Sequence, residues 1–220
     1  MDIFITQNSY YFVHRHFLNL FLKNNSYIIY VREIKKGIFR KYYDFLLNFG
    51  LLNTFFSCIM EFVYFTLLSR KVGELKISIT DDADLNSFLE NKLKTGNFNR
   101  VFSIGCPCKI NAEFQKKYKI NIYNLHGGII PYQIGRFSPI KSLRKGHSYL
   151  GASLHLISKV FDEGTIVSQD YFQTNNKYII ANYNKVLKIS SSLLGCFFNG
   201  TIKKIPLDVF KDLEKSNRPD

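Results

Sequence analysis

The sequence predicts an α/β fold in which helices flank a doubly wound, mostly parallel β-sheet. Short apolar runs that are typical of buried strands alternate with stretches of helical periodicity along most of the chain, and this alternation favours parallel strand–helix–strand units. The 220 residues, 46% of them hydrophobic, suffice for one domain of ordinary size. No internal repeat and no Pro- or Ser-rich linker divides the sequence.

The expected elements follow from these patterns. Runs of aliphatic and aromatic residues predict strands at 3–6, 27–31, 76–80, 101–105, 120–126, 151–158 and 165–172. Apolar residues at helical spacing predict helices at 12–22, 39–68 with a break near Gly50, 84–93, 112–118, 139–145 and 178–197. Asp84 opens one of them with a carboxylate that suits the N-cap. After residue 197 we expect a loose tail.

The charge of the chain is strongly positive, with 30 Lys and Arg against 17 Asp and Glu and a formal net charge of +13. Such a balance favours anionic partners: nucleic acid, a membrane surface, or small molecules that carry phosphate or carboxylate groups. The basic residues are spread along the chain, so a generally basic surface is the simpler interpretation. The four cysteines form one C-x-C pair and no zinc spacing with the histidines. We therefore expect reduced thiols, a cytoplasmic location and no metal.

One segment, 49–68, is long and apolar enough to resemble a membrane span. However, four polar residues recur along it at helical spacing and make a polar stripe: Asn53, Thr54, Ser57 and Glu61. The pattern predicts a helix whose apolar face is buried in the fold or against a partner subunit. A membrane-surface role is the alternative.

The most informative stretch is 124–139. It begins with Asn-Leu-His, the last residues of an expected buried strand, and two glycines follow directly. Residues two apart on a strand point the same way, so Asn124 and His126 project together from the carboxyl end, where open α/β sheets bind ligands. An amide can stabilise an oxyanion, and an imidazole can manage the proton of an attacking amine. Asp162 and Glu163 offer a carboxylate to orient the imidazole. The local pattern alone also fits a histidine in a surface turn.

Three separated motifs carry a resemblance to a known family. They are Asn124-Leu-His-Gly-Gly-Ile-Ile-Pro-Tyr, then Gly151-Ala-Ser-Leu-His155, then Asp162-Glu-Gly-Thr-Ile. In order and in interval they resemble the formyltetrahydrofolate-dependent formyltransferases, over residues 101–169. The resemblance implies a Rossmann-like formyltransferase domain at 1–175 and a helical extension at 176–220 packed on it. Ile134 departs from the family's usual Arg, and Gly128 stands where Ser is common.

The resemblance also implies roles for individual residues. Asn124 would polarise a formyl carbonyl, His126 would act as general base or acid, and Asp162 would pair with His126, while His155 would buttress the site. The segment 102–110 corresponds to the place where the family holds the pterin ring of the folate. The cofactor-binding candidates are Cys106, Lys109, Ile110 and Phe161.

The expected acceptor of the formyl group is inferred from three features of related enzymes that this sequence does not show. The Gly-Ser-Asn phosphate loop of glycinamide ribonucleotide enzymes, the C-terminal tRNA domain and the N-terminal regulatory domain of the hydrolases are not evident. The resemblance thus favours formyl transfer from 10-formyltetrahydrofolate to a nucleotide-linked aminodeoxysugar for surface polysaccharide such as O-antigen. The best candidate is dTDP-4-amino-4,6-dideoxyglucose, with a 3-amino isomer and a uridine nucleotide as alternatives. Candidate substrate-binding residues are Gln7, Asn8, Tyr132 and Arg136. We expect a homodimer that binds neither nucleic acid nor membrane. The alternatives are a non-catalytic folate- or nucleic-acid-binding protein on this fold and a glycinamide ribonucleotide-type formyltransferase.

Overall fold

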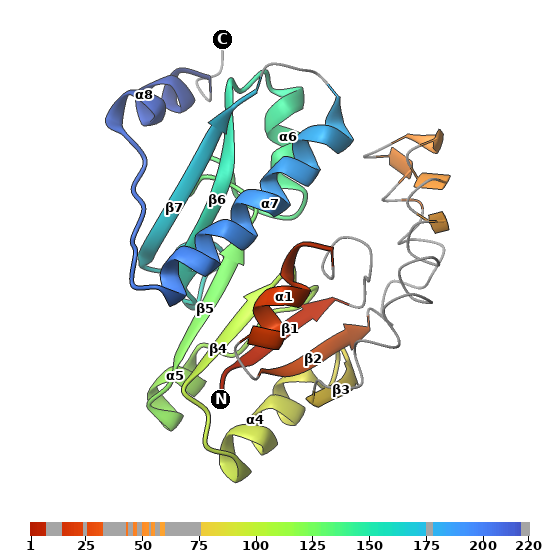
Figure 1. The fold of residues 1–220 in the computed structure, drawn as a ribbon, viewed down its shortest axis with the longest axis vertical. Coiled ribbons are helices and arrows are strands. Elements are labelled where there is room, and N and C mark those ends of the chain that lie inside the picture. Colours follow the sequence, from red (N-terminus) through yellow and green to blue (C-terminus); the bar gives the residue numbers. More distant parts are fainter. Residues whose placement is uncertain are drawn as a thin grey trace. The chain divides into compact units, whose positions relative to one another are not determined.

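The chain folds into a seven-stranded sheet with helices packed on it, which is the fold class that the sequence predicts (Figure 1). The strand order is β3-β2-β1-β4-β5-β6-β7. The computed structural model describes residues 1–7, 15–23, 26–32, 43, 46–47, 50–52, 54–55, 58–59, 76–174 and 178–216. Two compact units divide the chain, residues 1–123 and 124–220. The assignment of 1–175 and 176–220 as domain and extension stays a prediction.

The first unit holds the parallel part of the sheet. Its strands are β1 (Ile3–Gln7), β2 (Tyr27–Arg32), β3 (Lys76–Asp81) and β4 (Arg100–Ile104). Strand β1 pairs in parallel with β2 and β4, and β2 pairs in parallel with β3. The β1 side chains of Ile3, Phe4 and Ile5 are completely buried, which explains a continuous apolar run instead of an alternating one.

Three helices of this unit have described bounds: α1 (Arg15–Lys23), α4 (Leu85–Thr95) and α5 (Glu113–Tyr118). Helix α4 buries Leu85, Leu89 and Leu93, which recur every fourth residue and form one stripe against the core. The expected N-cap is wrong in one respect, because the Asp84 side chain makes no capping hydrogen bond.

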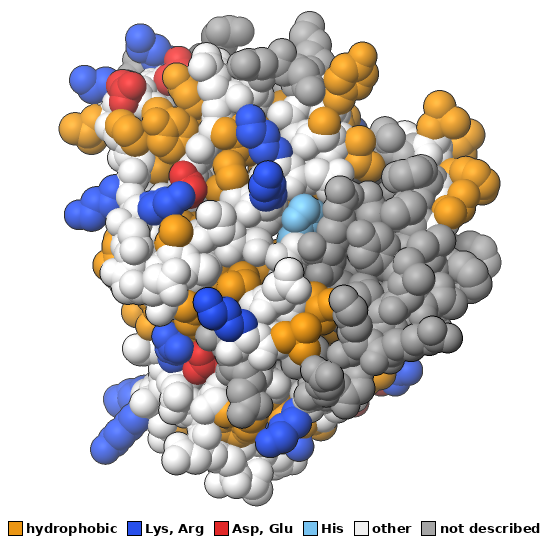
Figure 2. Space-filling view, in the orientation of Figure 1, with side chains coloured by type: hydrophobic (Ala, Val, Ile, Leu, Met, Phe, Trp, Pro, Cys, Tyr) orange, Lys and Arg blue, Asp and Glu red, His pale blue; other side chains and the backbone are white. Residues whose placement is uncertain are grey.

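Most of the apolar segment 49–68 lies outside the described residues. Gly50 has φ +80°, outside the helical region, at the point of the expected break. Figure 2 shows hydrophobic side chains exposed at several places on one face of the molecule. Leu51, Leu52 and Phe55 are 73%, 83% and 67% exposed, so the chain itself does not bury them. Burial of this face against a partner subunit stays a prediction. Among the described residues, no helix is both long and apolar enough to cross a bilayer.

The second unit is built around an antiparallel pair. Strand β5 (Asn121–His126) reaches into it with its carboxyl end, and α6 (Ser138–Arg144), β6 (Tyr149–Leu156), β7 (Ile166–Gln173), α7 (Ile179–Phe198) and α8 (Leu207–Ser216) follow. Strands β6 and β7 pair antiparallel, with Leu150 opposite Phe172 and a register shift between Leu154 and His155.

Alternate side chains of β6 and β7 pack against two different helices, α7 and α8. Leu150 and Phe172 pack against Val186 of α7, whereas Tyr149 and Tyr171 pack in the cluster that contains α8. Because side chains alternate across a strand, the two helices cover opposite faces of the β6–β7 pair (Figure 1).

Helix α8 was not expected, so the predicted loose tail is wrong. Val209 and Leu213 lie one helical turn apart and are buried with Ile129 and Ile205. Pro206 directly precedes the helix, a common position for proline. The spacing of the two apolar residues and this proline were signals that the sequence offered.

The segment between α7 and α8 runs along β7. The backbone N–H of Gln169 donates to the Lys203 carbonyl at 3.0 Å, and the Lys203 N–H donates to Ser168 Oγ at 2.9 Å. The Lys203 ammonium also pairs with Asp170 at 2.6 Å. Three consecutive residues of β7 are thereby bonded to one residue of this segment.

Candidate active site

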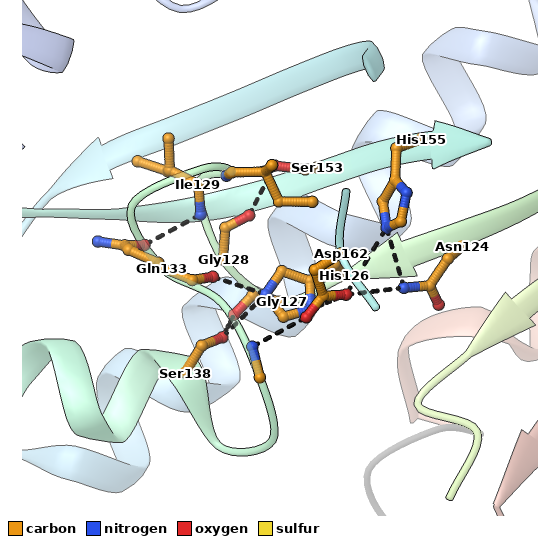
Figure 3. A network of polar contacts seen from close by, with 12 residues as sticks. Asn124, His126, Gly127, Gly128, Ile129, Gln133, Ser138, Ser153, His155 and Asp162 are labelled. Carbon is orange, nitrogen blue, oxygen red and sulfur yellow. Dashed lines mark hydrogen bonds and ion pairs between the residues drawn. The ribbon is translucent and has the colours of Figure 1, made fainter. Parts of the chain in front are cut away.

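The carboxyl end of β5 presents Asn124 and His126 on the same side, as the strand period predicts (Figure 3). Asp162 meets them from the turn before β7. Its Oδ1 lies 3.5 Å from His126 Nδ1 and 3.4 Å from Asn124 Nδ2. The structure therefore brings the three predicted catalytic side chains together.

Asp162 is held by its own backbone as well as by its neighbours. Its φ is +57°, in the left-handed region that Asp and Asn tolerate better than most residues. Its second carboxylate oxygen, Oδ2, accepts a hydrogen bond of 2.8 Å from the Gly135 N–H. The side chain is 7% exposed, so this carboxylate is a buried acceptor with fixed partners.

His126 is oriented through its Nε2 atom. That nitrogen lies 2.6 Å from the Gln133 carbonyl oxygen and 3.2 Å from Ser138 Oγ, while the Ser138 hydroxyl donates to the Gly127 carbonyl at 2.7 Å. A carbonyl can only accept, so Nε2 carries a hydrogen. Nδ1, the atom that faces Asp162, is therefore the nitrogen that is available to gain or lose a proton.

Gly128 makes room for this arrangement. A Cβ added there would lie 2.3 Å from the Gln133 carbonyl oxygen, 2.7 Å from Ser138 Oγ and 2.8 Å from His126 Nε2. The space that a side chain at this position would need is filled by the Gln133 carbonyl, the Ser138 hydroxyl and the His126 ring. The second glycine of the pair is thus a steric requirement of the site.

His155 fixes the amide of Asn124. Its Nδ1 lies 2.9 Å from the Leu156 carbonyl and must carry the hydrogen, which leaves Nε2 as an acceptor for Asn124 Nδ2 at 3.0 Å. Burial lowers the pKa of His155 below its ordinary 6.5, which favours this neutral form. The amide hydrogens therefore point toward His155 and Asp162.

Two more residues, Gln133 and Ser153, hold the loop after β5, and neither was among the predicted site residues. Gln133 accepts from the Ile129 N–H and donates to the Tyr149 carbonyl; Ser153 donates to the Gly128 carbonyl and accepts from the Ile130 N–H. Most of these hydrogen bonds end on backbone atoms, which no sequence pattern marks. The one signal in the sequence is Ser153, a polar residue inside the buried strand β6.

For the other predicted site residues within the described ranges, the structure gives the location, the burial or a ring contact. Gln7 ends β1, and Asn8 lies outside the described residues. In the first unit Cys106 is half-buried, Lys109 is exposed and the Ile110 side chain is buried. In the second unit Phe161 is 62% exposed, Tyr132 packs against Phe210 of α8, and Arg136 lies over the Phe137 ring. Their binding roles stay predictions.

As a whole, the cluster combines an amide donor, an imidazole with one available nitrogen and a buried carboxylate. This set can stabilise charge on an oxygen and move one proton. Within the described ranges, no three His, Cys, Asp or Glu side chains gather in a way that could hold a metal ion.

Comparison with known proteins shows the same fold in formyltransferases. The phosphoribosylglycinamide formyltransferase of Anaplasma phagocytophilum superposes with a TM-score of 0.59 at 12% identity, covering 87% of this chain and 80% of that one. A sugar N-formyltransferase from Shewanella sp FDAARGOS_354 gives 0.56 at 15% identity, with coverage of 94% and 73%. No family model matches the sequence.

In sequence, the chain is 28% identical over 69 residues to the formyltetrahydrofolate deformylase of Haemophilus influenzae. This match covers 31% of the chain and only 25% of the length of that relative. The chain therefore has the fold of the formyltransferases, and its substrates are a matter for proposal.

Proposed function

We propose that this protein is an N-formyltransferase that moves a formyl group from 10-formyltetrahydrofolate to the amine of a nucleotide-linked aminodeoxysugar. The observation that carries the proposal is the convergence of Asn124, His126 and Asp162, with Asp162 Oδ1 3.5 Å from His126 Nδ1. The formyltransferase fold and the partial match to a formyltetrahydrofolate deformylase support it.

The side chains divide the work of acyl transfer. The folate, when bound, supplies an activated formyl group. Asn124 Nδ2 redirects the hydrogen of its long 3.4 Å contact with Asp162 toward the formyl oxygen and stabilises the negative charge that develops there. His126 Nδ1 takes the proton that the attacking amine loses. Asp162 then faces an imidazolium and stabilises it.

The loop after β4 supports a folate site. Gly105 has φ +59°, and a side chain there would meet nothing within 4 Å, so the backbone is open to close approach. Lys109 is exposed and offers a cation to the carboxylates of a folate tail. Cys106, Ile110 and Phe161 are the further contacts that we propose from the family resemblance.

For the acceptor we propose dTDP-4-amino-4,6-dideoxyglucose. The support is the lack of a glycine phosphate loop after the first strand, where the sequence is TQNSYY, together with the resemblance to sugar N-formyltransferases. Gln7, Asn8, Tyr132 and Arg136 would contact the nucleotide and the sugar. The proposal includes a cytoplasmic homodimer.

A second candidate is hydrolysis of 10-formyltetrahydrofolate, with water in place of the amine. The specific observation in its favour is the 28% identity over 69 residues to a deformylase. The same triad would serve, because water also loses a proton as it attacks the formyl carbon.

Mass spectrometry can test both reactions in one experiment. The purified chain is incubated with 10-formyltetrahydrofolate, with and without a panel of thymidine and uridine diphosphate amino sugars, and formate is measured in parallel. A formyl group gained by one sugar supports transfer, whereas formate released without an acceptor supports hydrolysis. Asn124→Ala must lower either signal by about 10²-fold or more. Asn97→Ala, which changes an exposed asparagine, must leave the signal unchanged. If neither product forms although the chain binds folate, the protein is a non-catalytic folate-binding protein.

A further inference from the structure

Two thiols meet in the loop that follows β4. Cys106 and Cys108 flank Pro107, and their Sγ atoms lie 3.9 Å apart. The Cys106 thiol also lies 3.3 Å from the Cys108 carbonyl oxygen, to which it donates. Both residues are half-buried, so reagents in solvent can reach them.

The backbone that follows this pair is anchored. Beyond it, the Asn86 side chain donates to the Lys109 carbonyl at 3.0 Å and accepts from the Asn111 N–H at 2.8 Å. Ile110, between these two contacts, is 5% exposed. Before the pair, Gly105 turns the chain out of β4 with φ +59°. The loop is therefore held at residues 109–111, while the two sulfurs lie 3.9 Å apart.

We propose that Cys106 and Cys108 are a redox modification site that forms a reversible disulfide within the C-P-C loop. The S–S bond length is about 2.05 Å, so the sulfurs must approach by roughly 1.9 Å. The proposal requires that rotation about the two Cα–Cβ bonds and an adjustment at Pro107 bring the sulfurs together.

The oxidant is a low-molecular-weight disulfide such as glutathione disulfide. One cysteine thiolate attacks it, forms a mixed disulfide and releases one glutathione thiolate. The second cysteine then attacks the protein-side sulfur of the mixed disulfide and releases the second glutathione. The two cysteines lose two protons and two electrons, and the glutathione disulfide is reduced to two thiols.

A regulatory consequence rests on the proposed function. The segment 102–110 is the one proposed to hold the pterin ring, and oxidation re-aims two side chains within it. Loss of one hydrogen bond or equivalent contact to the ring lowers affinity about tenfold. We therefore expect the oxidised chain to bind folate about tenfold more weakly than the reduced chain.

Peptide mass spectrometry tests the site without reference to activity. The full chain is equilibrated with glutathione buffers of rising oxidised fraction, quenched in acid, alkylated and digested with trypsin without reduction. Both cysteines fall on the tryptic peptide 101–109. We expect this peptide to appear without alkylation, lighter by two hydrogens, and to return to the doubly alkylated form with dithiothreitol. Cys58 and Cys196 are half-buried as well and serve as internal controls. Oxidation of either one should add a single glutathione to its peptide and should not produce a peptide that is lighter by two hydrogens.

Variants decide between an internal disulfide and separate reactions. Cys108→Ser should leave Cys106 to accumulate one glutathione, while Cys196→Ser should behave as the parent chain does. The proposal is overturned if peptide 101–109 carries two alkyl groups at every glutathione ratio, or two glutathiones without an internal disulfide.

Fluorescence titration with 5-formyltetrahydrofolate tests the consequence. The oxidised parent chain should bind about tenfold more weakly, and Cys106→Ser/Cys108→Ser should not respond to oxidant. Equal affinity in both redox states would overturn the regulation and leave the disulfide standing. No folate binding in either state would overturn the proposed function, whereas the peptide masses would still decide on the disulfide.

Discussion

Replacing Gly128 with alanine should damage both the stability of the second unit and the orientation of His126. The new Cβ would lie 2.3 Å from the Gln133 carbonyl oxygen, where an ordinary carbon–oxygen contact is about 3.3 Å or more. The obstructing atom belongs to the backbone and cannot rotate away. The loop that carries Gln133 must therefore move by about 1 Å.

The magnitude follows from two terms. Overpacking of this kind costs about 1–3 kcal/mol, and loss of the hydrogen bond between His126 and the Gln133 carbonyl costs about 1 kcal/mol more. We expect a loss of about 3 kcal/mol in the free energy of unfolding. In a chain of this size, 1 kcal/mol shifts Tm by about 2–4 °C, so Tm should fall by roughly 6–12 °C.

Differential scanning calorimetry on Gly128→Ala and Gly127→Ala measures the effect against a matched control. A Cβ at the neighbouring Gly127 would lie 3.4 Å from Val186 and 3.8 Å from Pro139, which is ordinary contact. Gly127→Ala should therefore melt within about 2–3 °C of the parent chain, or slightly above it. If the two variants melt within about 2 °C of each other, the steric argument for Gly128 is wrong.

Three further predictions concern the polar cluster. Asn124→Ala should lower kcat by about 10²–10³-fold, because the donor to the developing oxyanion is lost. It should also lower the free energy of unfolding by about 1–3 kcal/mol, because Nε2 of the buried His155 loses its donor. An effect on KM alone would contradict the catalytic role. Ser138→Ala should lower kcat several-fold in steady-state assays, because His126 keeps the Gln133 carbonyl but loses a partner at 3.2 Å; unchanged kinetics would show that the carbonyl alone orients the ring. The folded-state pKa of His155 lies below the unfolded value of 6.5, so the unfolded state binds more protons. The free energy of unfolding should therefore fall as the pH drops below about 6.5, by at most ~1.4 kcal/mol per pH unit. Urea unfolding at pH 7.5 and 5.5 checks this, and His155→Gln, which keeps an acceptor without the titration, should weaken the pH dependence; equal dependence in both chains would refute it.

The sequence predicts the fold well because its signals are local. Strand β1 is a run of buried apolar residues, and α4 carries leucines one turn apart, so burial and periodicity point to the same structure. The triad was predictable for a related reason. Asn124 and His126 share a strand face by the strand period, and Asp162 follows at an interval that matches a known motif.

What the sequence did not predict depends on backbone atoms and on packing between distant segments. Gln133 orients His126 through its carbonyl, which every residue possesses, so no side-chain pattern marks it. Ser138 reaches the site only because α6 begins where the loop after β5 returns. The capping role of Asp84 failed because the geometry of one turn decides whether the carboxylate reaches a backbone N–H.

The contacts of Lys203 have a consequence for association between chains. Strand β7 is the last strand of the sheet, and an uncovered final strand offers backbone donors and acceptors to any extended chain that it meets. Here the Lys203 carbonyl takes the Gln169 N–H, and the Lys203 ammonium covers Asp170 beside it. A new strand that approached β7 at this point would have to displace a charged residue before it could form its first bonds. The segment between α7 and α8 therefore blocks strand addition at residues 168–170 of the β7 edge, and a chain cut after Gly200 should aggregate more readily than the full chain.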